Sequence, residues 1–283
     1  MSRSANAERW AVTPRFPEEF PAPWAGEWGE DEFGLWMVLR YREARLQFRW
    51  IEPGTFQMGS PPDEPERADR ETQHEVTLTR GYWLADTACT QDLWVEVMSR
   101  NPSEFQDDPN NPVEAVSWGD VQDFIAQLNG DVEALNARLP SEAEWEYACR
   151  AGARESLPFS FGATITPEQV NYNGEYPYAG GTKGLYREKT VPVKSLPPNA
   201  WGLYEMHGNV WEWCADWYGD YPPGPIDDPT GPSEGARRVL RGGSWFHNAR
   251  GARSAYRDHD APSNRVDNDG FRLALGPVHP PGR

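Results

Sequence analysis

The sequence is poor in cysteine and in long apolar runs. Its three cysteines, Cys89, Cys149 and Cys214, form no Cys-x-x-Cys pair. This usage predicts buried free thiols in a reducing compartment rather than a disulfide framework. No run approaches the roughly 18 apolar residues of a membrane span, and the N-terminal region lacks the pattern of a signal peptide. We therefore expect a cytoplasmic protein with no membrane partner.

Basic residues are scarce relative to acidic ones. The chain has 27 Lys and Arg against 44 Asp and Glu, which gives a formal net charge of -17. A protein that binds duplex nucleic acid needs a basic footprint, so we expect no nucleic-acid partner. Acidic residues concentrate between Asp63 and Glu75 and around Asp107, Asp131 and Asp227. We interpret these clusters as a solvated acidic surface that aids solubility.

Aliphatic content is low as well. Hydrophobic residues make up 38% of the chain, and its mean hydropathy is -0.78. The 14 Trp, 11 Tyr and 11 Phe residues offset this deficit, because each buries a large area. The 26 Gly and 27 Pro residues indicate that much of the backbone is loop and turn. The composition therefore predicts an irregular fold with little regular secondary structure.

Local patterns predict a small number of regular elements. Apolar alternation indicates strands, and Ser or Thr caps followed by helical periodicity indicate helices. The clearest cap is Ser141 with Glu144, which forms a capping box. Helical signals end near Gly152. We expect strands at 33–41 and 75–84, a hairpin at 48–59, and helices at 90–98, 117–128 and 141–148.

The chain shows no internal repeat and no low-complexity linker, which favours one domain over two. Residues 1–45 are rich in Trp, Pro and Glu and are expected to form an arm that packs on the core. Residues 46–283 are expected to form the domain itself.

Several motifs occur in a specific order along the chain. They are GTFQMGS (54–60), HEV (74–76), PVEAVSW (112–118), RLPSEAEWEYA (138–148), NAWGLYEMHGNVWEW (199–213), RVLRGGSW (238–245) and GFR (270–272). This set resembles the formylglycine-generating enzyme, or sulfatase-modifying factor, family. The resemblance implies an α+β, C-type-lectin-like fold with much irregular structure and few short helices and strands.

The resemblance also implies a catalytic site, which can be checked in the sequence. The aerobic enzymes of the family bind copper through two cysteines that follow the Gly-Gly-Ser-aromatic motif. In this chain the matching segment, 245–250, contains no cysteine, and His247 stands about where the first would be. A Cu(I) site needs thiolates, so we expect no copper and no enzymatic activity. The alternatives are an oxidoreductase of the formylglycine-generating type or an accessory module of the family.

A calcium site is the second implication of the resemblance. The family binds calcium in the loop that corresponds to residues 205–212. Carboxylates and backbone carbonyls on a glycine-bearing loop suit this ion. The alternative is that the two glutamates pair with nearby arginines. The matching groups here are the side chains of Glu205 and Glu212 and the carbonyls of Gly208 and Val210.

The C-terminal region, about 238–275, alternates a regular frame with irregular gaps. The frame consists of RGGSW, AR, ARSAYR, PS, R and GFRLAL. It resembles the variable proteins of diversity-generating retroelements, in which template adenines are randomised. Asparagine codons of the AAC type then cannot become Lys, Glu, Gln, Met or Trp codons. None of those residues stands at the thirteen gap positions, which are Phe246, His247, Asn248, Gly251, Asp258, His259, Asp260, Ala261, Asn264, Val266, Asp267, Asn268 and Asp269.

This second resemblance implies a ligand-binding protein with a diversified C-terminal surface. The arginines of the frame can anchor loops through forked hydrogen bonds, which leaves the gap side chains free to vary. The gaps mix Phe and Val with Asp and His, which favours a protein ligand over a polyanion. The alternative is that the gaps are ordinary tolerant surface loops.

Overall fold

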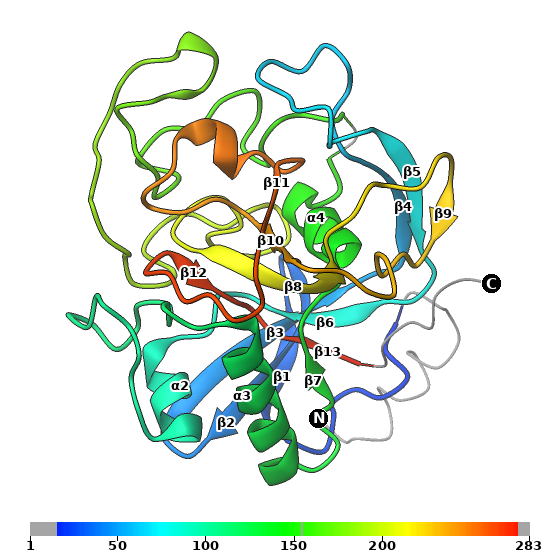
Figure 1. Cartoon of the computed structure of the whole chain (residues 1–283). Helices are drawn as coiled ribbons and strands as arrows, with labels where there is room; N and C mark the ends of the chain where they lie inside the picture. Colours follow the sequence, from blue (N-terminus) through cyan, green and yellow to red (C-terminus); the bar gives the residue numbers. More distant parts are fainter. Residues whose placement is uncertain (1–15, 154, 277–283) are drawn as a thin grey trace.

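The computed structural model describes residues 16–153 and 155–276. These residues form three β-sheets, three α-helices and long irregular connections (Figure 1). The mixed α+β class and the large share of irregular backbone therefore agree with the expectation from Gly and Pro content.

The largest sheet has six strands, all paired antiparallel. Its penultimate strand comes from the end of the described chain, which returns to lie between two strands that are distant in sequence. In order across the sheet the strands are β1 (Ala25–Asp31), β2 (Gly34–Tyr41), β3 (Ala44–Ile51), β6 (Tyr82–Ala85), β13 (Ala274–Leu275) and β7 (Ala137–Arg138).

Two smaller sheets complete the β structure. The four-stranded sheet has the order β11 (Arg257–Asp260), β10 (Arg238–Arg241), β8 (Trp211–Trp217) and β12 (Asp269–Gly270). The three-stranded sheet has the order β4 (Gly54–Met58), β5 (His74–Leu78) and β9 (Ile226–Asp227). Because β12 and β13 are separated by only a few residues, the four-stranded and six-stranded sheets are linked directly.

The three helices begin where the sequence predicts them. Thr90 caps α2 (Gln91–Met98) through the backbone N–H of Leu93. Capping boxes open α3 (Trp118–Asp131) and α4 (Glu142–Arg150). Figure 1 shows α2 and α3 beside the six-stranded sheet.

The main hydrophobic core lies between this sheet and the helices α2 and α3. Trp94 of α2 stacks on Phe124 of α3 with ring centroids 5.1 Å apart, and both rings contact Phe271. Buried aromatic rings thus supply the packing that the low aliphatic content could not.

Two strand expectations are wrong in detail. The segment 48–59 is not a hairpin, since β3 pairs with β2 and β6 whereas β4 pairs with β5 in another sheet. The segment 75–84 is divided between two sheets, as β5 and β6. A Cβ on Gly81 would lie 2.3 Å from the ring of Trp50 and 2.7 Å from the carbonyl of Ile51. Only glycine fits that close approach, at the point where the chain leaves one sheet for the other.

The expected N-terminal arm is closely integrated with the core. Phe16, Phe20 and Trp24 pack against the main core, and the strands β1 and β2 continue the six-stranded sheet. The boundary proposed after residue 45 falls within β3. The first fifteen residues of the arm lie outside the described residues.

No helix in the described ranges combines the length and the apolar character that crossing a membrane would require.

Candidate ligand-binding surface

Four arginines of the C-terminal frame are fully buried and ion-paired. Each guanidinium group donates to carboxylates on a distant part of the chain. Arg253 donates to Glu64 (2.6 Å) and to both oxygens of Glu71 (2.7 and 2.8 Å). Such forked pairs fix both the position and the orientation of the backbone that carries them. The other three pairs are Arg241 with Glu146, Arg257 with Glu142, and Arg272 with Glu212.

Helix α4 is the anchor for two of these arginines. All nine of its residues are buried, which is unusual for a helix with three glutamates. Arg257 donates to both oxygens of Glu142 at 2.6 and 2.7 Å, and Arg241 pairs with Glu146. Burial opposes ionisation of Glu142, but the Arg257 and Arg241 guanidinium groups outweigh it and hold the pKa of this carboxyl below its ordinary value.

The acidic segment 63–75 is therefore not simply a solvated surface, as its composition suggested. Glu64 and Glu71 are buried under the C-terminal frame and hold Arg253. Ser60 also donates to Glu71, from its hydroxyl group. Part of this loop thus acts as a support for the region that follows β10.

Gly242 and Gly243 turn the chain out of β10. Their φ angles are +99° and +75°, which side-chain-bearing residues rarely adopt. A Cβ on Gly243 would lie 2.9 Å from the backbone of Ala252. The Gly-Gly-Ser motif is therefore required by a tight turn packed against the short helix η2 (Ala249–Ala252).

Trp245 is the aromatic anchor of the frame. Its indole Nε1–H donates to the carbonyl of Asp267 at 3.2 Å. Its ring packs edge-on against Phe105 and stacks on Tyr186. These contacts join the segment after β10 to the loop 173–187, whose residue Asn173 donates its N–H to the carbonyl of His247.

The thirteen gap positions divide into three groups by exposure. Four are exposed, namely Phe246, Asn248, Asn264 and Val266. Six are partly exposed, namely His247, Asp258, His259, Asp260, Ala261 and Asp267. The remaining three are buried, namely Gly251, Asn268 and Asp269. Ten of the thirteen therefore reach the surface.

The three buried positions correct the expectation that every gap position contacts a ligand. Asp269 lies in β12, which pairs with β8, and burial raises the pKa of its carboxyl well above the ordinary value. The carbonyl of Asn268 accepts from the N–H of Trp211. Gly251 lies in η2, and a Cβ there would be 3.6 Å from the ring of Trp211. These residues belong to the packed frame.

Comparison with known families identifies the family of this chain. The model of the sulfatase-modifying factor enzyme 1-like domain matches residues 41–276. This chain belongs to that family. It is 39% identical to a formylglycine-generating enzyme of Streptomyces coelicolor over 217 residues, which cover 71% of this chain and 66% of the enzyme. For the first four formylglycine-generating enzymes matched, the aligned segment spans 44–66% of the relative's length.

Solved structures of two proteins resemble most of this fold. Variable protein 1 of Treponema denticola is 28% identical, with a TM-score of 0.72, and the match covers 86% of this chain and 99% of that protein. PvdO of Pseudomonas aeruginosa is also 28% identical, with a TM-score of 0.68, covering 89% and 99%. The expected α+β, C-type-lectin-like family fold is confirmed, as is the resemblance to a variable protein.

His247, which the resemblance places about where a copper-binding cysteine is expected, lies in the turn after β10. The ring is partly buried, and its Nδ1 lies 3.1 Å from Trp211 Nε1, which donates to it, and 2.8 Å from Ser244 Oγ. Burial lowers the pKa of this imidazole. These contacts hold the turn that carries His247. The segment 245–250, in which His247 lies, contains no cysteine.

The three cysteines are buried free thiols. Cys149 is the most interesting, since its sulfur lies 3.7 Å from His207 Nε2 and from Ser254 Oγ. Burial raises the pKa of Cys149 to about 12 and lowers the pKa of His207 to about 4. His207 is also fixed by Ala252 and Ser160, at 2.7 and 2.9 Å. Both groups are neutral at pH 7, so this cluster is a packed core rather than a nucleophile and base.

The residues of the expected calcium site do not fit that ion as they are arranged. Both oxygens of Glu212 are taken, by Arg272 at 2.6 and 2.7 Å and by the indole of Trp145 at 2.6 Å. Glu205 accepts from the backbone of Lys194, and its second oxygen has no hydrogen-bond partner among the described residues. Within the same residues, no group of three or more His, Cys, Asp or Glu side chains is placed to hold a metal.

Proposed function

We propose that this chain is a non-enzymatic ligand-binding protein, the variable protein of a diversity-generating retroelement. The alternation of buried frame and exposed gap carries this proposal. Arg241, Arg253 and Arg257 are buried and bonded, whereas Phe246 and Asn248, a few residues along the same chain, face solvent. A surface built in this way can change its side chains without losing its backbone geometry.

The likeness to variable protein 1 of Treponema denticola supports the same proposal, since it extends over nearly all of that protein. The missing thiols in segment 245–250 support the absence of copper chemistry.

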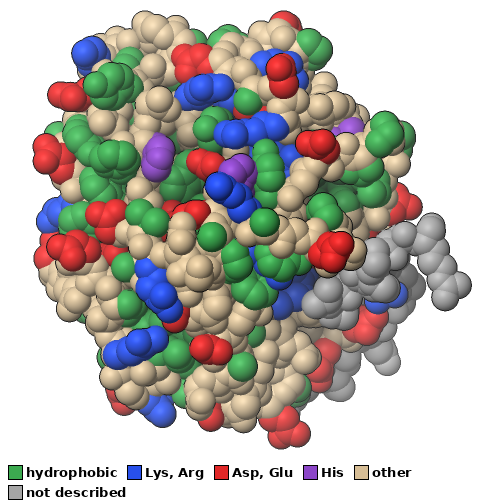
Figure 2. Space-filling view, viewed as in Figure 1, with side chains coloured by type: hydrophobic (Ala, Val, Ile, Leu, Met, Phe, Trp, Pro, Cys, Tyr) green, Lys and Arg blue, Asp and Glu red, His purple; other side chains and the backbone are tan. Residues whose placement is uncertain are grey.

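We propose a protein as the ligand, because the surface carries an apolar patch. Large apolar side chains are exposed around Trp245: Tyr176 (59%), Leu185 (57%), Phe246 (54%) and Val266 (37%). In Figure 2, hydrophobic side chains on the left of the view lie among acidic and basic ones. A patch of this kind on a charged surface is typical of protein interfaces.

The patch combines gap positions with residues outside the variable region. Tyr176 and Leu185 belong to the loop 173–187, which bonds to the segment after β10 at two places. One is the N–H of Asn173 to the carbonyl of His247, and the other is the N–H of Ala249 to the carbonyl of Tyr176. The loop 173–187, which contains no gap position, thus adjoins the gap positions after β10 in the proposed binding surface.

Two experiments test the proposal. Sequencing of the flanking DNA should reveal a near-copy of codons 240–275 that differs only where the copy has adenine, with a reverse-transcriptase gene beside it. Absence of both would remove the retroelement assignment. The second experiment offers the copper-treated protein oxygen and a cysteine-containing peptide, with an active family member as positive control. We expect no aldehyde product, and turnover would overturn the non-enzymatic assignment.

The competing function is a formylglycine-generating oxidoreductase. Identity to the Streptomyces coelicolor enzyme favours it. The turnover experiment separates the two functions directly.

A further inference from the structure

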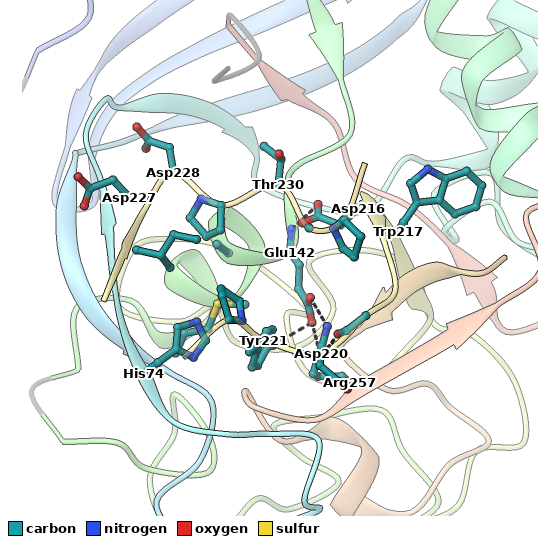
Figure 3. Close-up of a pocket in the computed structure, with 18 residues that line it drawn as sticks. His74, Glu142, Asp216, Trp217, Asp220, Tyr221, Asp227, Asp228, Thr230 and Arg257 are labelled. Atoms are coloured by element: carbon teal, nitrogen blue, oxygen red, sulfur yellow. Dashed lines mark hydrogen bonds and ion pairs between the residues drawn. The ribbon is translucent and has the colours of Figure 1, made fainter. Parts of the chain in front are cut away.

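A cavity lies at the end of β11 that begins with Arg257. It has a volume of about 310 Å³ and is lined by α4, the end of β8, the segment 219–232 that contains β9, and single residues of β4, β5 and β11 (Figure 3). None of the thirteen gap positions lines it. Met58 and Ala143 form a buried apolar base, while Pro222, Pro229 and Pro232 contribute apolar surface nearer the rim. The cavity is large enough for a small ligand or a long side chain.

Asp216 is one of three buried charged residues that line this cavity, with Glu142 and Arg257. Its side chain is deeply buried, with the residue 4% exposed. Its Oδ2 accepts from the backbone N–H of Glu142 at 2.9 Å, a contact drawn in Figure 3. Its Oδ1 has no hydrogen bond within the described residues. A Cβ on Gly231, another lining residue, would lie 3.3 Å from Oδ1, so this oxygen faces the loop that encloses the cavity.

Asp216 differs from the other buried acids around α4. Glu142, Glu144 and Glu146 each have an arginine within ion-pair distance. No arginine, lysine or histidine of the described residues pairs with Asp216. Burial and the neighbouring charge of Glu142 raise the pKa of Asp216 to about 8. A group with this pKa is largely protonated at pH 7, and a bound cation would favour its ionised form; shifted pKa values of this kind are common in binding sites.

The charge around the cavity is also one-sided. Asp220 and Asp227 stand exposed at the rim, and Asp228 is bonded to Thr79. Arg257 is the sole arginine or lysine in the lining. Its Nε and Nη2 groups donate to the two carboxylate oxygens of Glu142. The cavity therefore lacks an unpaired cation of its own and presents carboxylates to a ligand.

We propose that this cavity binds an organic cation, an ammonium or guanidinium group on an apolar stem, with Asp216 Oδ1 as the acceptor at its inner end. The apolar base and proline rim match the stem, and the rim carboxylates favour entry of a cation. The same chemistry is offered by a free alkyl amine or guanidine and by a lysine or arginine side chain of a peptide. No gap position lines this cavity, but gap position His259 packs on Tyr218, which lies between the lining residues Trp217 and Gly219.

Titration calorimetry of the full chain tests the proposal with butylguanidinium as the probe. Pentanamide is the neutral control and pentanoate the anionic one. We expect butylguanidinium to bind, the amide to bind at least about 10-fold more weakly, and pentanoate to show no binding, because a charged hydrogen bond is lost. Equal affinity for cation and amide would overturn the proposal. So would the absence of any butylguanidinium binding at millimolar concentration.

A matched pair of variants locates the site. Asp216→Asn keeps the side-chain volume and removes the charge, and should weaken butylguanidinium binding by about 10- to 100-fold. Asp123→Asn makes the same charge change on the exposed face of α3 and should leave it unchanged. Equal effects of the two variants would contradict the assignment. If Asp216→Asn does not fold, the comparison of cation with amide on the unmodified chain still decides.

The source of the cation is settled by a second probe. An acetylated alanine pentapeptide with one central arginine is titrated beside butylguanidinium. Tighter binding of the peptide supports the site as a receptor for a basic side chain. Tighter binding of the free guanidine supports the site as one for a small molecule.

Discussion

Replacement of Arg253 gives the sharpest test of the frame. Arg253→Met removes a guanidinium group that is fully buried, and it leaves the carboxylates of Glu64 and Glu71 without their cation. Breaking a buried ion pair from one side costs about 3–5 kcal/mol, because the remaining charge stays desolvated. That cost is a large part of the roughly 5–15 kcal/mol by which domains are stable. We expect Arg253→Met to fold marginally, with a urea midpoint far below that of the unmodified chain.

Arg250→Met is the matched control, three residues away. Arg250 is partly exposed and donates to the carbonyl of Glu66 rather than to a carboxylate. Removing that bond should cost about 1 kcal/mol. Urea unfolding followed by tryptophan fluorescence measures both variants. Equal losses of unfolding free energy for Arg253→Met and Arg250→Met would refute the argument that buried pairs fix the loops.

The cost of Arg253→Met should also depend on pH. Burial already raises the pKa of the Glu64 carboxyl while Arg253 opposes it, so loss of the guanidinium group raises that pKa further and the folded state prefers the protonated form. The contribution of neutral carboxyls to stability is present below the unfolded pKa and is lost as pH rises through the folded pKa. The deficit of Arg253→Met should therefore be smaller at pH 5 than at pH 8. Adding Glu71→Gln should recover part of it, by removing one unpaired charge.

Three further predictions follow from the site. The triple variant Phe246→Ser, Asn248→Ser and Asn264→Ser should change the unfolding free energy by less than about 1.5 kcal/mol, since replacing each exposed side chain changes it by at most about 0.5 kcal/mol. Thermal unfolding measures this change, and a larger loss would show that these residues belong to the packed frame. Millimolar Ca²⁺ should leave the melting temperature unchanged, because Arg272 and Trp145 occupy the oxygens of Glu212; a rise of several degrees that a chelator reverses would contradict this. A thiol reagent should label none of the three cysteines at pH 8 until the protein is denatured, because burial raises each thiol's pKa; rapid labelling of one equivalent would show an accessible thiolate.

Local signals in the sequence identified the elements that depend on local physics. Capping residues placed α3 and α4 correctly, since Ser117 with Asp120 and Ser141 with Glu144 bond within one turn. Strand pairing was harder to predict, because the partner of a strand is not local. Within 48–59, the one local sign that β3 and β4 belong to different sheets is Pro53, which interrupts the alternation between them.

The same reasoning explains which site residues the sequence could and could not reveal. The arginines of the frame could be predicted as anchors, because a forked guanidinium group suits that task. Their partners could not, since Glu64 and Glu71 precede Arg253 by 189 and 182 residues. The cavity lined by Asp216 was not identified from the sequence. Its carboxylate, Asp216, follows the WEW motif as one more acidic residue, and only the fold shows that it lacks a cation.

The distribution of the anchoring carboxylates explains how one region can be both fixed and variable. Arg253 is held by the loop between β4 and β5, Arg241 and Arg257 by α4, and Arg272 by β8. Three separate parts of the molecule, through four arginines, thus determine the path of the C-terminal region. Because none of these bonds involves the side chain of Phe246, replacing that residue changes the surface and leaves the path intact. The binding surface can therefore be altered at low cost in stability, which is the property that a diversified ligand-binding protein requires.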